Sequence, residues 1–162
     1  MRMPALLFAF TFILSCGDSS DTSTTDRTDG YTPVLKNKED SLFHDVMQGH
    51  DVGMAKMGKL SGALKTVQKQ LDSIESLSGR ERGQLTDYKA LLNSLKEELQ
   101  QAETGMMLWM EEFVADSLQD NPEQRAEYLA SEKAKVEKVR DDILGSLAKA
   151  DSVFKGVGKL TN

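Results

Sequence analysis

The sequence has little of several residue types on which enzyme and metal chemistry depend. Its 162 residues include one cysteine, two histidines and three prolines, and aromatic residues make up 6%. A single cysteine excludes a disulfide framework and a zinc site built from several cysteines. Two histidines leave few nucleophile–base pairs, and the sequence shows no phosphate-binding glycine loop or other catalytic motif. We therefore expect a protein that is not an enzyme.

Basic stretches are missing as well. Twenty lysine and arginine residues stand against 26 aspartate and glutamate residues, which gives a net charge of −6 at pH 7. Nucleic-acid binding needs a basic patch that matches the phosphate backbone. We therefore expect no nucleic-acid partner. The scarcity of proline leaves long helices free to form.

The first residues resemble a bacterial lipoprotein signal. Arg2 supplies a positive charge, and an apolar run from Ala5 to Leu14 follows. This run is shorter than the roughly 20 residues that span a bilayer, so residues 1–15 are predicted to be a signal peptide rather than a membrane helix. Ile-Leu-Ser-Cys at 13–16 resembles a lipobox, which implies cleavage before Cys16 and attachment of palmitate-type acyl chains there. Ordinary secretory cleavage with a free cysteine is the alternative.

Residues 16–40 are predicted to form a lipidated, disordered tether. They are rich in serine, threonine and aspartate and have almost no apolar content, so they cannot bury enough surface to fold. Two or more acyl chains anchor a protein stably to a membrane. We expect a cell-envelope protein on the inner or the outer membrane, with its folded domain outside the cytoplasm.

Residues 41–162 are predicted to be all-α, as an up-down-up three-helix bundle or antiparallel coiled coil. Apolar residues recur three and four positions apart over about 41–76, 82–118 and 122–155. Gly79 is predicted to be a left-handed cap in the first turn, and Asn121-Pro122 to start the third helix. Short connections make successive helices antiparallel. Dimerisation into a larger bundle stays open.

One end of the predicted bundle concentrates methionine, histidine and tryptophan. The six methionines that follow the signal, both histidines and the only tryptophan lie within residues 44–57 and 106–110. A turn at Gly79-Arg80 places His50 beside Trp109, and Gly53 beside Met106. The same reasoning places Glu132 of the third helix near this level, with Tyr128 about one turn away.

Two interpretations of this cluster compete. Flexible methionines commonly fill irregular parts of a core. Alternatively, thioether and imidazole groups bind Cu(I), because soft ligands select that ion. A haem held by His50 and one methionine is a third interpretation, although no C-x-x-C-H attachment is present. The candidate Cu(I) ligands are His50, Met47, Met54, Met57, Met106 and Met110, with Trp109, Gly53, Gly105 and Glu132 supporting the cluster.

The histidines and the glycines at this end of the bundle lead to two further predictions. No carboxylate lies one turn before or after His50, so a buried ring is predicted to find its partner on another helix, such as Glu132 or Tyr128, in water or in a metal. His44 and Asp51 are either a separate exposed pair or independently solvated. Glycines at 49, 53, 58 and 62 disfavour the helix and predict close backbone approach or reserved space.

The motifs HDVGMAKMGKL at 50–60 and MMLWM at 106–110, behind a lipobox, resemble a group of small helical lipoproteins from Bacteroidota. Members are often labelled viral A-type inclusion proteins. The resemblance covers most of the mature domain and implies a helical fold and an envelope location, without an activity or a ligand. Ala55 stands where proline is expected in that group, so a kink there is not implied.

Two functions follow from these features. The first is a membrane-anchored, non-catalytic envelope lipoprotein that acts as a structural or interaction module for another envelope protein. The alternative is a Cu(I)-binding lipoprotein for copper buffering, sensing or handover.

Overall fold

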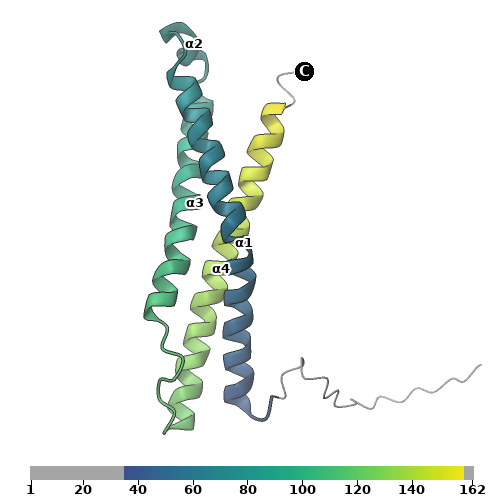
Figure 1. The fold of residues 1–162 in the computed structure, drawn as a ribbon, viewed down its shortest axis with the longest axis vertical. Coiled ribbons are helices and arrows are strands. Elements are labelled where there is room, and N and C mark those ends of the chain that lie inside the picture. Colours follow the sequence, from purple (N-terminus) through teal and green to yellow (C-terminus); the bar gives the residue numbers. More distant parts are fainter. Residues whose placement is uncertain (1–34, 159–162) are drawn as a thin grey trace, which may run out of the picture. The chain divides into compact units, whose positions relative to one another are not determined.

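The computed structural model of the protein describes residues 35–158, which are helical almost throughout (Figure 1). The helices are α1 (Lys38–Glu75), α2 (Gly79–Gln84), α3 (Thr86–Glu112) and α4 (Pro122–Gly158). The three long helices α1, α3 and α4 pack against one another, which confirms the predicted all-α, three-helix fold. The predicted signal peptide, Cys16 and the tether up to residue 34 lie outside the described residues.

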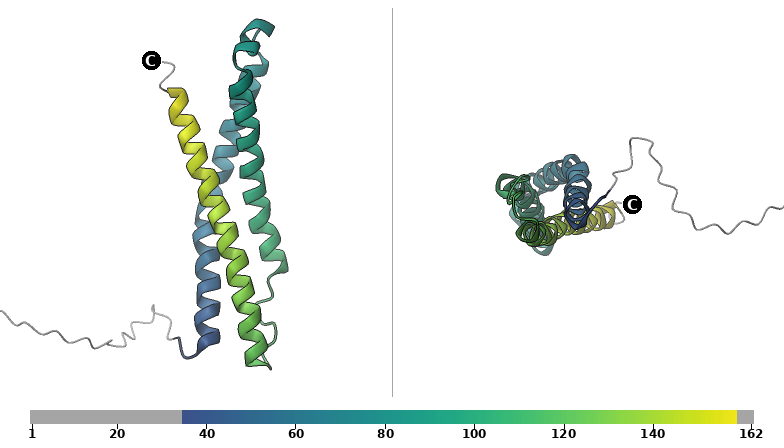
Figure 2. Two further views of the ribbon diagram at one scale, coloured as in Figure 1. Left: turned by 180° about the vertical axis from the view of Figure 1, so that it is seen from behind. Right: turned by 90° about the horizontal axis from the view of Figure 1, so that it is seen from below.

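Helices α1 and α3 run antiparallel, and α4 runs parallel to α1 (Figures 1 and 2). Three ion pairs join α1 to α4. Lys59 Nζ lies 2.8 Å from Asp151 Oδ2, Lys133 Nζ lies 2.8 Å from Asp45 Oδ2, and Arg125 Nε lies 3.6 Å from Glu39 Oε2. Between α1 and α3, Tyr88 donates its hydroxyl proton to Gln70 Oε1 at 2.7 Å. Short connections within this one chain are therefore enough to bury three amphipathic faces.

The core is an apolar seam that follows the predicted heptad positions. Each buried aliphatic side chain of Leu or Ile size contributes about 1.5–3 kcal/mol relative to its exposed state. Because all three helices contribute, no pair of them could bury this seam alone. The residues that lose all access to solvent include Val46, Leu60 and Val67 of α1, Leu92, Leu95 and Leu99 of α3, and Leu129, Val136 and Ile143 of α4.

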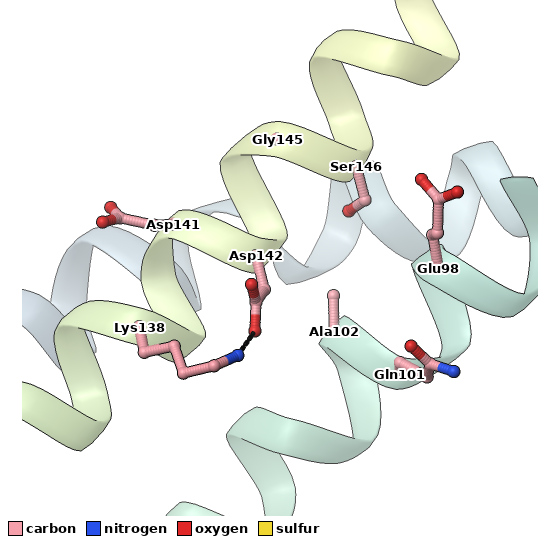
Figure 3. Close-up of a pocket in the computed structure, with 8 residues that line it drawn as sticks. All are labelled: Glu98, Gln101, Ala102, Lys138, Asp141, Asp142, Gly145 and Ser146. Carbon is pink, nitrogen blue, oxygen red and sulfur yellow. Dashed lines mark hydrogen bonds and ion pairs between the residues drawn. The ribbon is translucent and has the colours of Figure 1, made fainter.

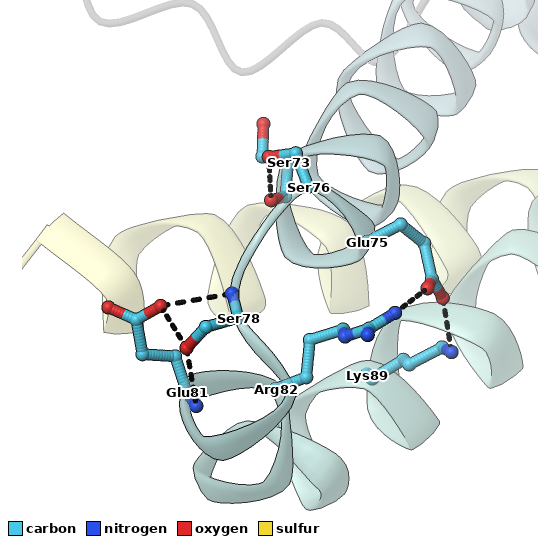
Figure 4. Close-up of polar contacts among 7 residues, drawn as sticks. All are labelled: Ser73, Glu75, Ser76, Ser78, Glu81, Arg82 and Lys89. Atoms are coloured by element: carbon cyan, nitrogen blue, oxygen red, sulfur yellow. Dashed lines mark hydrogen bonds and ion pairs between the residues drawn. The ribbon is translucent and has the colours of Figure 1, made fainter.

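A serine cap organises the turn between α1 and α3 (Figure 4). The Ser78 side chain accepts from the Glu81 backbone N–H, and the Ser78 backbone N–H donates to Glu81 Oε2 at 3.0 Å. This capping box starts the short helix α2 at once. The predicted left-handed cap at Gly79 is therefore wrong, because Gly79 is the first residue of α2 and has no positive φ.

Asparagine side chains set the starts of α1 and α4. Asn37 Oδ1 accepts from Asp40 N at 2.8 Å, so α1 begins at Lys38 rather than near residue 41, and its first turn takes in residues assigned to the tether. Asn121 Oδ1 accepts from Gln124 N at 3.2 Å, which confirms the predicted cap before Pro122. Helix α4 runs to Gly158, slightly past its predicted end.

Helix α3 ends at Glu112, and the prediction that it continues to about residue 118 is wrong. Phe113 adopts an extended conformation (φ −72°, ψ 120°). Leu118 has a φ of 58°, which is rare for a residue with a side chain. The segment from Phe113 to Asn121 is thus a connection rather than two further turns of helix.

Side chains of α4 explain why α3 stops. Tyr128 Oη accepts from Val114 N at 2.9 Å. The Arg125 guanidinium donates to the carbonyl oxygens of Ser117, at 2.6 Å, and Ala115, at 3.0 Å. These bonds satisfy backbone groups that would otherwise need helical partners. The apolar period alone does not reveal this competition.

Candidate functional site

Stacked rings join the three helices at the end that carries the methionines. The His50 and Trp109 ring centroids lie 5.7 Å apart, which confirms the predicted pairing of α1 with α3. Trp109 stacks on Phe113 at 4.8 Å, and Phe113 stacks on Tyr128 at 6.3 Å with an interplanar angle of 2°. Phe43 adds a tilted contact with Phe113 at 6.4 Å. These five rings thus connect all three long helices at this end of the bundle.

A buried carboxylate fixes the tryptophan. Trp109 Nε1 donates to Glu132 Oε2 at 3.0 Å, and Lys135 Nζ donates to Glu132 Oε1 at 2.7 Å. The hydrogen bond with Glu132, together with the negative charge of Glu132, raises the pKa of Lys135. The predicted height of Glu132 in the bundle is therefore confirmed, but its partner is Trp109 and not His50.

His50 finds its partner in the next residue of the chain. Its side chain is 20% exposed, and Nδ1 donates to Asp51 Oδ1 at 2.9 Å. For Nδ1, the prediction that the partner comes from another helix, water or a metal is wrong, because it considered carboxylates one turn away and not the adjacent one. His44 is also half-buried, and Asp51 pairs with His50 rather than with His44.

The six predicted metal ligands do not form one enclosed cluster. Met106 is fully buried, and its terminal methyl lies only 2.3 Å from where a Cβ on Gly53 would stand. Gly53 therefore leaves the space that Met106 fills. Met54 and Met110 are 38% and 39% exposed. The two ligands of intermediate burial are Met47 and Met57.

The helical glycines divide into two kinds. A Cβ on Gly49 would lie 2.9 Å from Val136 Cγ1 of α4, so Gly49, like Gly53, allows a close approach. A Cβ on Gly58 or Gly62 would meet no neighbouring atom within 4 Å. The predicted close approach is confirmed at the first two positions and is wrong at the other two.

Surface pockets on the described residues are open to solvent, and most of the residues that line them have polar or charged side chains. The pocket in Figure 3 has a volume of about 320 Å³ and lies between α3 and α4. Lys138 and Asp142 pair across 2.6 Å in its lining, beside Glu98 and Ser146. A second pocket on α3 includes the predicted support residue Gly105. Neither offers an enclosed apolar site. Within residues 35–158, no three His, Cys, Asp or Glu side chains are grouped to hold a metal ion.

Sequence reasoning missed an exposed apolar surface at the end of α3. Half of the large hydrophobic side chains that are exposed within residues 35–158 fall in this short stretch. The sequence signal was the motif MMLWM, which has more apolar residues than one helix face can bury. We call these five residues, which are close along the chain but do not share one helix face, the apolar strip: Met107, at 60% exposure, with Leu108, Met110, Val114 and Leu118.

The chain matches no protein-family model, no curated protein and no solved structure. Among the helices of the described part of the chain, none has an apolar stretch sufficient for a membrane span. The arrangement of the residues themselves therefore carries the functional argument.

Proposed function

We propose that the protein is a lipid-anchored, non-catalytic module of the cell envelope that binds another envelope protein. Its anchor is Cys16 of the lipobox, and its binding surface is the apolar strip. The resemblance to helical Bacteroidota lipoproteins supports this location. The single observation that carries the proposal is the concentration of exposed apolar side chains between Met107 and Leu118.

The composition of the strip favours a protein partner. Exposed apolar surface of this kind marks interaction sites, and methionine adapts its shape to a partner. Exposed acidic residues lie among the apolar ones, at Glu111, Glu112 and Asp116. The matching surface would therefore be apolar with basic side chains at its edge. Because the pockets described above are open to solvent rather than enclosed, contact across a surface fits better than capture of a small apolar ligand.

Photo-crosslinking in cells tests the binding surface. A photoreactive phenylalanine analogue at position 108 is expected to crosslink a distinct envelope protein, whereas the same group at exposed Lys65 of α1 is not. Adding Val114→Asp should remove the crosslink by placing a charge in the contact. Equal labelling from both positions, a product formed only with a second copy of the chain, or no product at all contradicts the proposal.

The anchor is tested on the same cells. The mature protein is expected to begin at Cys16, to carry acyl chains by mass spectrometry and to fractionate with membranes. Cys16→Ser is expected to lose the acyl chains and the membrane association. An unmodified wild-type mass would remove the anchor from the proposal without touching the binding surface.

A further inference from the structure

We propose that one Cu(I) ion binds at the surface seam between α1 and α3, held by His50 Nε2 and by the sulfurs of Met47, Met54 and Met110. This site is additional to the protein-binding function and does not depend on it, and Met110 is the one residue that the site shares with the apolar strip. It uses four of the six ligands suggested by sequence and leaves out Met57 and Met106.

The orientation of the His50 ring leaves one of its nitrogens available to a metal ion. Nδ1 donates to Asp51 Oδ1 at 2.9 Å, so the other ring nitrogen, Nε2, carries the free lone pair. Among residues 35–158 no hydrogen bond to Nε2 is present. A histidine that binds a metal through one nitrogen typically donates the other N–H to a carboxylate, which fixes its tautomer and raises its basicity. Asp51 is 73% exposed and thus serves as a positioning residue rather than as a core contact.

Two methionines of α1 lie on the same helix face as His50. Met47 lies three residues before His50, and Met54 lies four residues after it. These offsets put all three side chains on one face, about 4.5 Å and 6 Å apart along the helix axis. Flexible thioether side chains can close such distances onto one ion. Met57 lies a further turn away, so it cannot share an ion with His50 as readily.

The register of α3 brings a further methionine to this seam. The His50–Trp109 contact and the close approach of Met106 to Gly53 fix which residues face each other across the seam. Met110 follows Trp109 directly and is 39% exposed, so it lies at the open edge of this seam, near the level of His50. Met106 is fully buried, and its methyl fills the space above Gly53. Met106 therefore packs the core beneath the site.

The chemistry of these donor atoms suits Cu(I). Three thioethers and one neutral imidazole are soft or borderline ligands, which prefer Cu(I) to the hard divalent cations. The half-buried His50 and the partly exposed methionines are open to an ion from solvent without unfolding of the core. Trp109, at 5.7 Å from the His50 ring, is close enough to report binding through its fluorescence.

Competition for Cu(I) with a chromophoric chelator, under anaerobic conditions, tests the site. The full chain is used in detergent with Cys16→Ser, so that the thiol does not bind the ion. This protein is expected to withdraw one equivalent of Cu(I) from the chelator and to show quenched Trp109 emission. His50→Phe, or leucine at 47, 54 and 110 together, is expected to weaken binding at least tenfold. Asp51→Asn should weaken it by about tenfold, as loss of a carboxylate behind a ligand does.

Two matched controls separate a site from loose thioether binding. Met107→Leu changes a neighbouring methionine that is more exposed, and Met106→Leu changes the buried one. Both are expected to keep the affinity of the parent protein. The proposal is overturned if the parent binds no tighter than the triple leucine variant, or if Met107→Leu weakens binding equally. Circular dichroism of each variant checks that the helices remain folded.

Discussion

The glycines of α1 differ in whether the absence of a Cβ allows close packing against a neighbouring helix. Gly49 faces Val136 of α4 at a distance too short for any larger residue, while Gly58 and Gly62 face open space. Glycine in the interior of a helix costs roughly 1 kcal/mol relative to alanine. Gly49 therefore lowers the intrinsic stability of the helix but allows close packing of α1 on α4. Gly58 and Gly62 have no packing contact that offsets their cost.

Alanine substitutions should separate the two kinds of glycine. Gly58→Ala and Gly62→Ala are each expected to raise the free energy of unfolding by about 1 kcal/mol, through helix propensity. Gly49→Ala gains the same propensity but forces a Cβ against Val136, whose branched side chain is stiff at χ1. Overpacking typically costs about 1–3 kcal/mol, so a net loss of roughly 1 kcal/mol is expected.

Urea denaturation followed by the fluorescence of Trp109 measures these changes. Gly53→Ala is the informative comparison, because the atom it meets is the flexible end of Met106 rather than a branched side chain. It should therefore be better tolerated than Gly49→Ala. A stabilising effect of Gly49→Ala equal to that of Gly58→Ala would show that α1 and α4 do not approach closely there.

At the scale of the elements, the turn between α1 and α3 depends on one serine. Ser78→Ala removes the side-chain acceptor of the α2 capping box and is expected to lower stability by about 1 kcal/mol. Ser73→Ala is the matched control, since Ser73 Oγ donates only to the Lys69 carbonyl one turn earlier. The control is expected to be neutral or slightly stabilising by thermal denaturation. Equal losses from both substitutions would contradict a capping role.

The helices and their register could be predicted because local patterns determine them. A turn near Gly79, together with the apolar period, was enough to place His50 against Trp109 and Gly53 against Met106, and both contacts are present. The end of α3 could not be predicted in this way. Its backbone is satisfied by Tyr128, a side chain from a helix that follows in the sequence.

The candidate site was predictable in location but not in exposure. The sequence brought the methionines to one end of the bundle, whereas burial divides them into the core residue Met106 and the partly exposed Met54 and Met110. Burial depends on how far each helix rotates toward its neighbours, and a single apolar stripe does not fix that rotation. The pairing of His50 with Asp51 is a rotamer choice between adjacent residues, which helical spacing does not address.

For the whole molecule, ion pairs between elements predict sensitivity to acid. Hydrogen bonds with Lys89 and Arg82 lower the pKa of Glu75, and a hydrogen bond with Lys149 lowers the pKa of Glu98. A hydrogen bond with Lys59 lowers the pKa of Asp151. A carboxyl with a lowered pKa in the folded state stabilises that state fully above its unfolded pKa, which is about 4. This stabilisation is lost as the pH falls through the lower folded value.

The urea midpoint is therefore expected to be constant near neutral pH and to decrease below about pH 4. Because these carboxyls are largely exposed, added salt should make the decrease smaller. Lys149→Met removes the partner of Glu98 and should also make the decrease in the urea midpoint smaller. Lys65→Met, at an exposed lysine, should leave that decrease unchanged. If neither salt nor Lys149→Met changes the acid dependence, groups other than these ion-paired carboxyls cause it.

The parallel arrangement of α1 and α4 has a consequence for the order of assembly. Asp45 and Lys133 are 88 residues apart along the chain, and Lys59 and Asp151 are 92 apart. Contacts that join α3 to its neighbours span less, from 18 residues for Gln70–Tyr88 and 23 for Trp109–Glu132 to 51 for Glu98–Lys149 and 59 for His50–Trp109. Each doubling of a closed loop costs about 0.6 kcal/mol in chain entropy, so the two hairpins close at a lower entropic cost. Once both have formed, α1 and α4 are already neighbours, and we expect their interface to be the last part of the bundle to assemble.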